Sequence, residues 1–137
     1  MTNFATPFAA ESAFYAAFEA ADVDAMMRVW EDSELITCIH PLAAPLRGPT
    51  QLRASWQQIF ATGTRLRFRI SNINTVAQNG LAIHVVYENI TVVNAGEQPR
   101  QPIIATNIYS RKPEGWRIIL HHASPAPPIE DGSRRLH

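Results

Sequence analysis

The spacing of apolar residues changes once along this chain, near residue 64, from a helical period to a strand period. Before that point apolar side chains recur every three or four residues, as on one face of an amphipathic helix. After it they alternate with polar side chains, which is typical of a strand with one buried and one solvated face. A chain with helices first and strands afterwards is expected to fold as an α+β domain, not as a parallel sheet with alternating helices.

Three helices and one short strand are predicted before residue 64. Thr6-Pro7 opens the first helix well, because the hydroxyl can cap free amides and proline suits the first helical position. Phe14 and Phe18 then lie four residues apart on one apolar side. Asp22 can cap the second helix, and Thr62-Gly63 stops the third. The predicted helices span about 7–21, 23–30 and 50–61, and the strand spans 35–40.

The second half of the chain predicts four longer strands joined by tight turns. Gln78-Asn79-Gly80 is a hairpin signal, and so are segments 94–97 and 112–115. Arg65, Arg67 and Arg69 alternate with apolar residues, so we interpret them as a solvated strand face. The predicted strands span 64–71, 81–93, 103–110 and 116–124. One domain over residues 1–125 accounts for all these elements, and the proline-rich segment 126–137 is expected to be a flexible tail.

The charge balance argues against several classes of partner. Twelve basic and twelve acidic residues are spread along the 137 residues, so nothing indicates binding to a nucleic acid or an anionic membrane. Cys38 is the only cysteine and cannot form an internal disulfide. The first residues lack the basic start and apolar core of a signal peptide, and we expect a cytoplasmic protein. No apolar run is long enough to span a bilayer, so the hydrophobic residues should form a core or line a cavity.

Several motifs, taken in order, resemble the nuclear transport factor 2-like superfamily. They are Phe14-Tyr15 through Ala21-Asp22 to Met26, Trp30-Glu31-Asp32, the strand that ends at His40-Pro41, and Leu46-Arg47-Gly48 before a helix. The last hairpin, with Ala105–Tyr109, Gly115-Trp116-Arg117 and His121–Pro125, resembles that of polyketide-cyclase-like and kinase-association-domain members, and the chain as a whole resembles the polyketide-cyclase-like and ketosteroid-isomerase-like branch. The resemblance covers residues 8–125. It implies a cone of about three N-terminal helices packed on a strongly curved, mostly antiparallel sheet, with a cavity between them and usually a homodimer.

The resemblance gives two polar residues a candidate catalytic role. His40 stands where isomerases of the superfamily carry a proton-shuttling aspartate, and a histidine of ordinary pKa could act as a general base. The competing interpretation is a loop-edge histidine bonded to the backbone. Asn107 aligns with a pocket-facing position where isomerases hold an oxyanion donor, and an amide can also donate. Alternatively, Asn107 satisfies a neighbouring backbone group.

His121 and His122 are further catalytic candidates. They are consecutive in a predicted strand, so their side chains point to opposite faces and one of them should face the cavity. The apolar series Trp116, Ile118 and Leu120 favours His122 on the buried side, whereas a shift of one residue in the alignment favours His121. The sequence leaves this choice open.

Other residues could line the cavity. His84 and Glu88 share one face of a predicted strand, and they are either cavity groups or part of its wet side. For Glu88 the wet side is favoured, because an unpaired buried carboxylate is costly. Four aromatic residues are expected in the core and could also form the ligand wall: Phe14, Tyr15, Trp30 and Trp56.

Two functions follow from these residues. One is a cofactor-independent isomerase, dehydratase or cyclase that acts on a small apolar organic molecule, with His40 as base and Asn107 as oxyanion donor. The other is a non-catalytic ligand-binding or assembly module. Isomerases carry a first-helix tyrosine where this chain has Phe14, and Tyr15 lies about 100° around the helix, which argues against ketosteroid isomerisation. No phosphate loop, nucleophile elbow or metal-binding histidine pair is visible, so we expect no cofactor and no metal.

Overall fold

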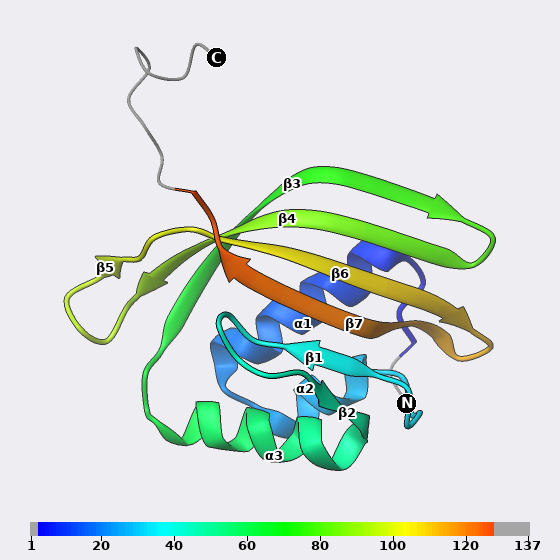
Figure 1. Ribbon diagram of the computed structural model, residues 1–137, viewed down its shortest axis with the longest axis horizontal. Coiled ribbons are helices and arrows are strands. Elements are labelled where there is room, and N and C mark those ends of the chain that lie inside the picture. The colour runs from blue at the N-terminus through cyan, green and yellow to red at the C-terminus, as the bar shows by residue number, and fades with distance from the viewer. Residues whose placement is uncertain (1–2, 128–137) are drawn as a thin grey trace, which may run out of the picture.

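The computed structural model describes residues 3–127, and its elements follow the predicted order of helices and then strands (Figure 1). They are α1 (Pro7–Ala20), α2 (Val23–Val29), β1 (Thr37–Ile39), β2 (Leu46–Arg47), α3 (Gly48–Ala61), β3 (Leu66–Gln78), β4 (Leu81–Val92), β5 (Gln98–Pro99), β6 (Ile103–Lys112) and β7 (Gly115–Pro125). The predicted α+β class is confirmed. The short strands β2 and β5 were not predicted, because two residues are too few to show a period.

The first two helices begin at the caps that the sequence predicts. Thr6 Oγ1 accepts a hydrogen bond from the Ala9 N–H at 3.0 Å, and Asp22 Oδ1 accepts one from the Ala25 N–H at 3.0 Å. Ala21 ends α1 in the left-handed conformation, with φ of 54°. The chain therefore turns directly from α1 into α2.

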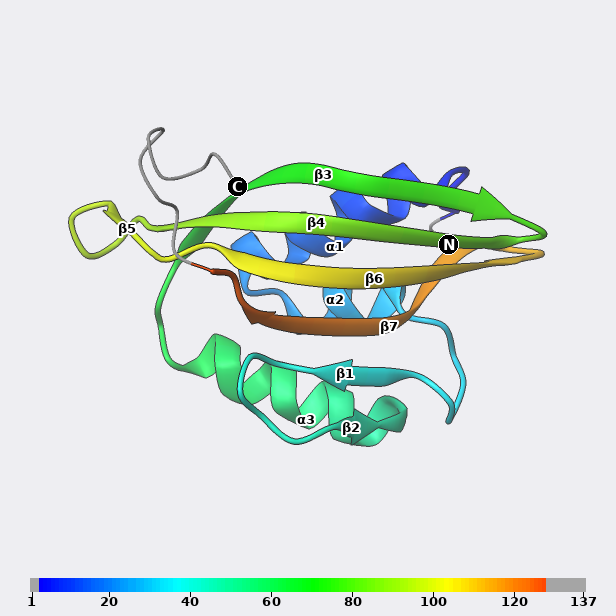
Figure 2. The same ribbon diagram turned by 45° about the horizontal axis from the view of Figure 1, so that its top comes forward.

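The strands form one mixed sheet in the order β2-β1-β7-β6-β4-β3, with β5 paired to the end of β4. Every pairing is antiparallel except that of β1 with β7. The three helices lie on one face of this sheet, which we call the inner face (Figure 2). Phe14, Leu52 and Trp56 are fully buried there in one core cluster that also contains Tyr109 and Ile118. The inner face therefore faces a core rich in aromatic side chains.

β3 is longer than the sequence indicates, because it continues to Gln78 where alternation predicts an end near residue 71. Its second half mixes polar and apolar residues without a regular alternation, since β3 is an edge strand and these side chains are exposed. A β-bulge between Asn72 and Asn74 interrupts the pairing with β4. The predicted turn after β3 is confirmed, with positive φ at both Asn79 and Gly80.

A second β-bulge lies in β7. Ile108 pairs with Leu120 and Tyr109 pairs with Ile118, so Ile119 is an extra residue with no partner in β6. Ile118 and His121 are consequently both buried although they lie three residues apart. The bulge reverses the alternation of faces in the second half of the strand.

The described chain ends on the sheet. The Ala126 N–H donates to the Pro102 carbonyl at 3.0 Å, and Ala126 is buried. The rest of the predicted tail, from residue 128 to 137, lies outside the described residues. Among those that are described, no helix combines the length and the apolar character needed to cross a membrane.

Candidate functional site

A row of side chains crosses the inner face at the middle of the sheet. Cross-strand pairing sets His84 of β4 beside Asn107 of β6, Asn107 beside His121 of β7, and His121 beside Cys38 of β1. All four side chains are buried, with at most 2% of their surface exposed. Because direct cross-strand neighbours share a face, the sheet register alone brings these residues together.

Four buried side chains in and above this row form a hydrogen-bonded group that we call the polar cluster: Tyr15, Glu88, Asn107 and His121. His121 Nδ1 donates to Asn107 Oδ1 at 2.6 Å, and Asn107 Nδ2 donates to the Tyr15 hydroxyl at 3.0 Å. The Tyr15 hydroxyl donates to Glu88 Oε2 at 2.7 Å. His121 Nε2 lies 4.0 Å from the same Glu88 oxygen. The cluster is therefore a nearly closed loop of polar groups from three strands and α1.

Burial shifts the protonation of the polar cluster toward neutral forms. It raises the pKa of Glu88 to about 7, although the hydrogen bond from Tyr15 opposes this shift. It also lowers the pKa of His121 to about 3, with a contribution from the nearby His40 and His122. The pKa of Tyr15 rises through burial and then through the negative charge of Glu88. At neutral pH His121 is uncharged, and Glu88 is the member of the cluster that gains or loses a proton.

His40 lies beside the polar cluster without bonding to it. Its ring is half-buried, packs edge-on against Trp56 at 4.9 Å between centroids, and lies 6.4 Å from the His121 ring. Its Nε2 lies 3.1 Å from Ser55 Oγ and 3.6 Å from Cys38 Sγ. Burial lowers the pKa of His40. The alternative prediction, a hydrogen bond between the His40 side chain and the backbone, is wrong, because the ring bonds to the side chain of Ser55 instead.

A second buried pair lies at the other end of the row. His84 Nδ1 is 2.8 Å from Glu11 Oε1, and Asn72 Nδ2 donates to both Glu11 oxygens at 3.3 Å. The Phe8 ring covers His84 at 4.6 Å between centroids. His84 is thus buried as a predicted cavity residue would be, but its partner is a helix carboxylate.

The expectation that Glu88 lies on a wet face is wrong, and the choice between His121 and His122, which the sequence left open, falls to His121. Glu88 is 3% exposed and does not lie on a wet face, because Tyr15 satisfies a carboxylate that the sequence left without a partner. His122 is exposed and lies away from the polar cluster, whereas His121 is buried in it. The apolar series favoured His122 because it assumed unbroken alternation, and the bulge at Ile119 breaks that alternation.

The four aromatic candidates are core residues, as the sequence favours. Phe14 contacts both His121 and Trp56, with ring centroids 5.0 and 5.8 Å apart, so both aromatic rings pack beside the polar cluster. Trp30 is also buried, but it packs at the edge of β7 near Ile118. Tyr15 is the one aromatic residue that enters the polar cluster, although the resemblance aligned Phe14 with the functional tyrosine.

The sequence missed Glu11, Ser55 and Asn72. Glu11 had a detectable signal, because it lies three and four residues before Phe14 and Tyr15 on the buried side of α1. Ser55 and Asn72 had none, since each meets its histidine or carboxylate partner from a distant part of the chain. No group of three or more metal-binding side chains occurs within residues 3–127.

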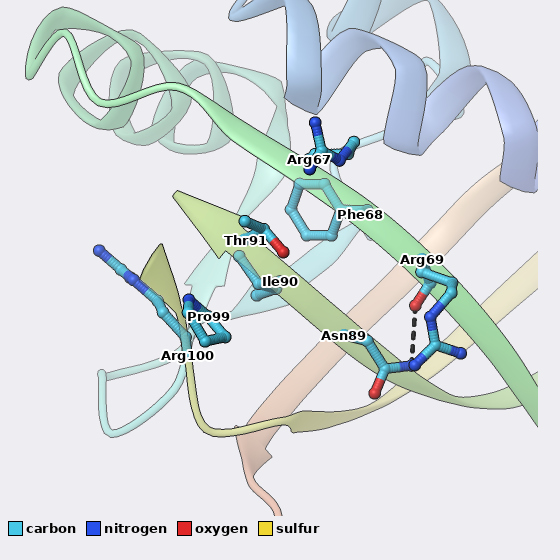
Figure 3. Close-up of a pocket in the computed structure, with 8 residues that line it drawn as sticks. All are labelled: Arg67, Phe68, Arg69, Asn89, Ile90, Thr91, Pro99 and Arg100. Atoms are coloured by element: carbon cyan, nitrogen blue, oxygen red, sulfur yellow. Dashed lines mark hydrogen bonds between the residues drawn. The ribbon is translucent and has the colours of Figure 1, made fainter. Parts of the chain in front are cut away.

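Two surface pockets lie near these strands. One of about 310 Å³, between α1 and β3, is lined in part by Tyr15, Glu11 and Asn72, so it reaches the edge of the polar cluster. The other, of about 460 Å³, lies where β3, β4 and β5 meet. Figure 3 shows its three arginine side chains, Arg67, Arg69 and Arg100, pointing away from one another. Arg67 there pairs with Glu97 at 3.2 Å with both side chains more than half exposed, so the predicted solvated face is confirmed.

Comparison with known families gives one clear match. The model of a family described as a SnoaL-like domain matches residues 9–130. Among solved structures, a protein of Thiobacillus denitrificans, provisionally named a calcium/calmodulin-dependent protein kinase type II association domain, is 43% identical. That alignment covers 93% of this chain and 100% of the other, with a TM-score of 0.87.

Two more distant relatives are informative. A protein of Streptomyces avermitilis, provisionally named a dehydratase of the nuclear transport factor 2-like family, is 28% identical over 86% of this chain and 91% of its own, with a TM-score of 0.76. The F-box protein SKIP8 of Arabidopsis thaliana is 24% identical over 81% of this chain. The chain spans about half the length of that relative, 46%.

Proposed function

Because this chain belongs to the family of SnoaL-like domains and has the nuclear transport factor 2-like fold, we propose that it is a cofactor-independent enzyme. Its substrate is a small apolar carbonyl compound, which it isomerises, dehydrates or cyclises. The observation that carries the proposal is the polar cluster itself. Four polar side chains buried beneath aromatic rings are costly to keep unless they serve a purpose, and a buried carboxyl group with a pKa of about 7 suits proton transfer at neutral pH.

His40 is the proposed general base. Its lowered pKa keeps the imidazole neutral at neutral pH, so it can take a proton from a carbon atom next to a carbonyl group. It is half-buried beside His121, and a ligand that contacted both rings would bridge His40 and the polar cluster.

The polar cluster is proposed to stabilise the charge that develops on the carbonyl oxygen. Asn107 has a second N–H besides the one that bonds to Tyr15; it is directed toward the Tyr109 hydroxyl and is the proposed donor to an oxyanion that replaces this neighbour. When Glu88 is protonated, its own O–H can bond to the Tyr15 oxygen, and the Tyr15 proton then becomes available to the ligand. The pocket between α1 and β3, which Tyr15 lines, is the proposed route of entry.

A dehydratase is the favoured member of this set of reactions, because one relative with 28% identity is provisionally named a dehydratase. A direct assay uses the aldol adduct of benzaldehyde and acetone, whose dehydration product absorbs in the near ultraviolet. We expect His40→Gln to remove most of the turnover, and wild-type turnover to fall as the pH drops through the pKa of His40, below 6.5. Asn107→Leu should cost about 2.7–4 kcal/mol of transition-state stabilisation.

Native mass spectrometry of freshly purified protein supplements this assay, because a co-purified molecule would reveal the natural ligand class. Gln57→Ala, on the exposed side of α3, is the matched control and should behave as wild type. If the wild type shows neither a bound molecule nor turnover, or if His40→Gln keeps the wild-type turnover, the catalytic proposal is wrong.

A non-catalytic association module is the second candidate function. It is supported by the relative with 43% identity that is provisionally named an association domain. It is also supported by apolar side chains exposed on the outer face, which is the face of the sheet opposite the helices. On this view the outer face binds a second copy of the chain, and the polar cluster holds a ligand without transforming it. Association through the outer face is compatible with either role of the polar cluster, since it uses the opposite face of the sheet.

A further inference from the structure

Ser55 is bonded to the residue proposed as the base, a contact that no pattern in the sequence indicates. It lies in the middle of α3, where a serine hydroxyl commonly bonds to the backbone one turn earlier. Instead its Oγ lies 3.1 Å from Nε2 of His40, at the end of β1. Its neighbour Trp56 points into the core, so Ser55 takes the side of the helix that meets β1.

The same nitrogen has a second neighbour. Cys38 precedes His40 by two residues and shares its strand face, and its Sγ lies 3.6 Å from Nε2. Burial raises the pKa of Cys38 to about 12, so it remains a thiol. Nε2 is therefore held between a hydroxyl and a thiol. No protein group within residues 3–127 bonds to Nδ1 of His40.

We propose that Ser55 is a positioning residue that keeps the proton of neutral His40 on Nε2, so that Nδ1 is the nitrogen that accepts a proton from a ligand. An Nε2–H group can be shared between two acceptors, the Ser55 oxygen and the Cys38 sulfur. A lone pair on Nε2 could accept from only one of the two donors. Ser55 is half-exposed, so its own hydroxyl hydrogen can bond to water.

The tautomer can be measured without any ligand. Nitrogen-15 spectra of the histidine rings distinguish a protonated from an unprotonated ring nitrogen, and they are recorded above the pKa of His40. In the wild type we expect a protonated Nε2 and an unprotonated Nδ1. In Ser55→Ala the share of the Nδ1–H tautomer should rise by about twofold or more, because the partner that fixes the proton is gone.

Two variants and one internal reference complete the test. Ser55→Thr keeps the hydroxyl and should restore the wild-type tautomer, while Ser12→Ala, on an exposed part of α1, should leave it unchanged. His122 is exposed and serves as the reference signal in every spectrum. A wild-type His40 protonated on Nδ1, or a tautomer that is the same in Ser55→Ala, overturns the proposal.

The catalytic consequence of this tautomer rests on the proposed function, but the tautomer itself does not. If the spectra agree and no turnover is found, Ser55 orients a histidine that only binds. If turnover depends on His40 and Nδ1 carries the proton, the enzyme proposal stands and the assignment of Nδ1 fails.

Discussion

Glu88 combines a carboxylate with almost complete burial, and its chemistry follows from that combination. The unfolded chain gives this group an ordinary pKa of 4.5, whereas the folded protein raises it to about 7. The folded protein therefore holds the proton more tightly than the unfolded chain does. The stabilising effect of this proton is complete below pH 4.5 and is lost as the pH rises through 7.

Glu88→Gln should remove this loss of stability at alkaline pH. A glutamine oxygen can still accept from Tyr15, but it cannot ionise. Relative to wild type, the free energy of unfolding of the variant should increase by about 2–3 kcal/mol between about pH 5 and pH 8, at roughly 1.4 kcal/mol per pKa unit. Urea unfolding at the two pH values measures the difference, and contributions from His121 cancel between the two proteins. An offset that is independent of pH would show that Glu88 stays charged in the fold.

Trp56 is a residue whose loss should be felt by the whole core. Its side chain is fully buried and contacts Phe18 and Phe60 as well as His40. Trp56→Ala should lower the free energy of unfolding by about 3 kcal/mol or more, because the cavity adds to the lost burial. Gln57→Ala on the same helix is the control. A thermal midpoint lowered by less than about 3 °C would mean that Trp56 is not part of a packed core.

At the scale of the elements, one extra residue in β7, the bulged Ile119, decides which side chains of that strand face the helices. Ile118 and His121 both face inward although they lie three residues apart. If Ile119 is deleted, they lie two residues apart, and regular alternation then puts both side chains on the same face. Thr106 lies in a regular part of β6, so its deletion has a different effect. Asn107 and the residues before it would then no longer both point to the faces of the sheet that they occupy now.

We therefore expect the Ile119 deletion to fold and to keep His121 bonded to Asn107, at a much smaller cost than the Thr106 deletion. Urea midpoints of the two deletion variants give the comparison, and the nitrogen-15 signals of His121 report whether its bond survives. Equal destabilisation by both deletions would contradict this account of the bulge.

The bulge also explains which parts of the structure the sequence could predict. Caps such as Thr6 and Asp22, and the turn at Asn79-Gly80, depend on residues a few positions apart, and they were predicted correctly. The face on which His121 lies depends on the extra residue in the pairing of β7 with β6, and the sequence of either strand alone does not indicate it. The burial of Glu88 depends on Tyr15, 73 residues away in the chain. Contacts between such distant residues can be identified only when the packing of the helices and the register of the strands are known.

The molecule as a whole has one face of its sheet covered by helices and one that no described element covers (Figure 2). Four apolar residues of the outer face are more than a third exposed, at 37–49%: Val76, Leu81, Ile83 and Tyr87. An exposed apolar patch of neighbouring residues marks a surface for association. A homodimer through this face stays a prediction, and the four residues named above are the ones that it would bury.

Ile83→Glu should therefore convert a dimer into a monomer, because it places a charge in the middle of the apolar patch. Light scattering at micromolar concentration gives the mass of each form, and Gln57→Glu on α3 controls for added charge. Wild-type protein with a mass near the 15.3 kDa of one chain would refute the dimer.

Glu19 of α1 has a consequence that reaches beyond the fold. β3 is the edge of the sheet, and a long edge strand offers free N–H groups on which another chain can build a further strand. The Glu19 carboxylate accepts from the Phe68 N–H of that edge at 2.7 Å, and the bulge at Asn72 bends the same edge further along. The carboxylate occupies a position that a foreign strand would need. A helix side chain thus closes one of the positions on this edge to which another strand could bond.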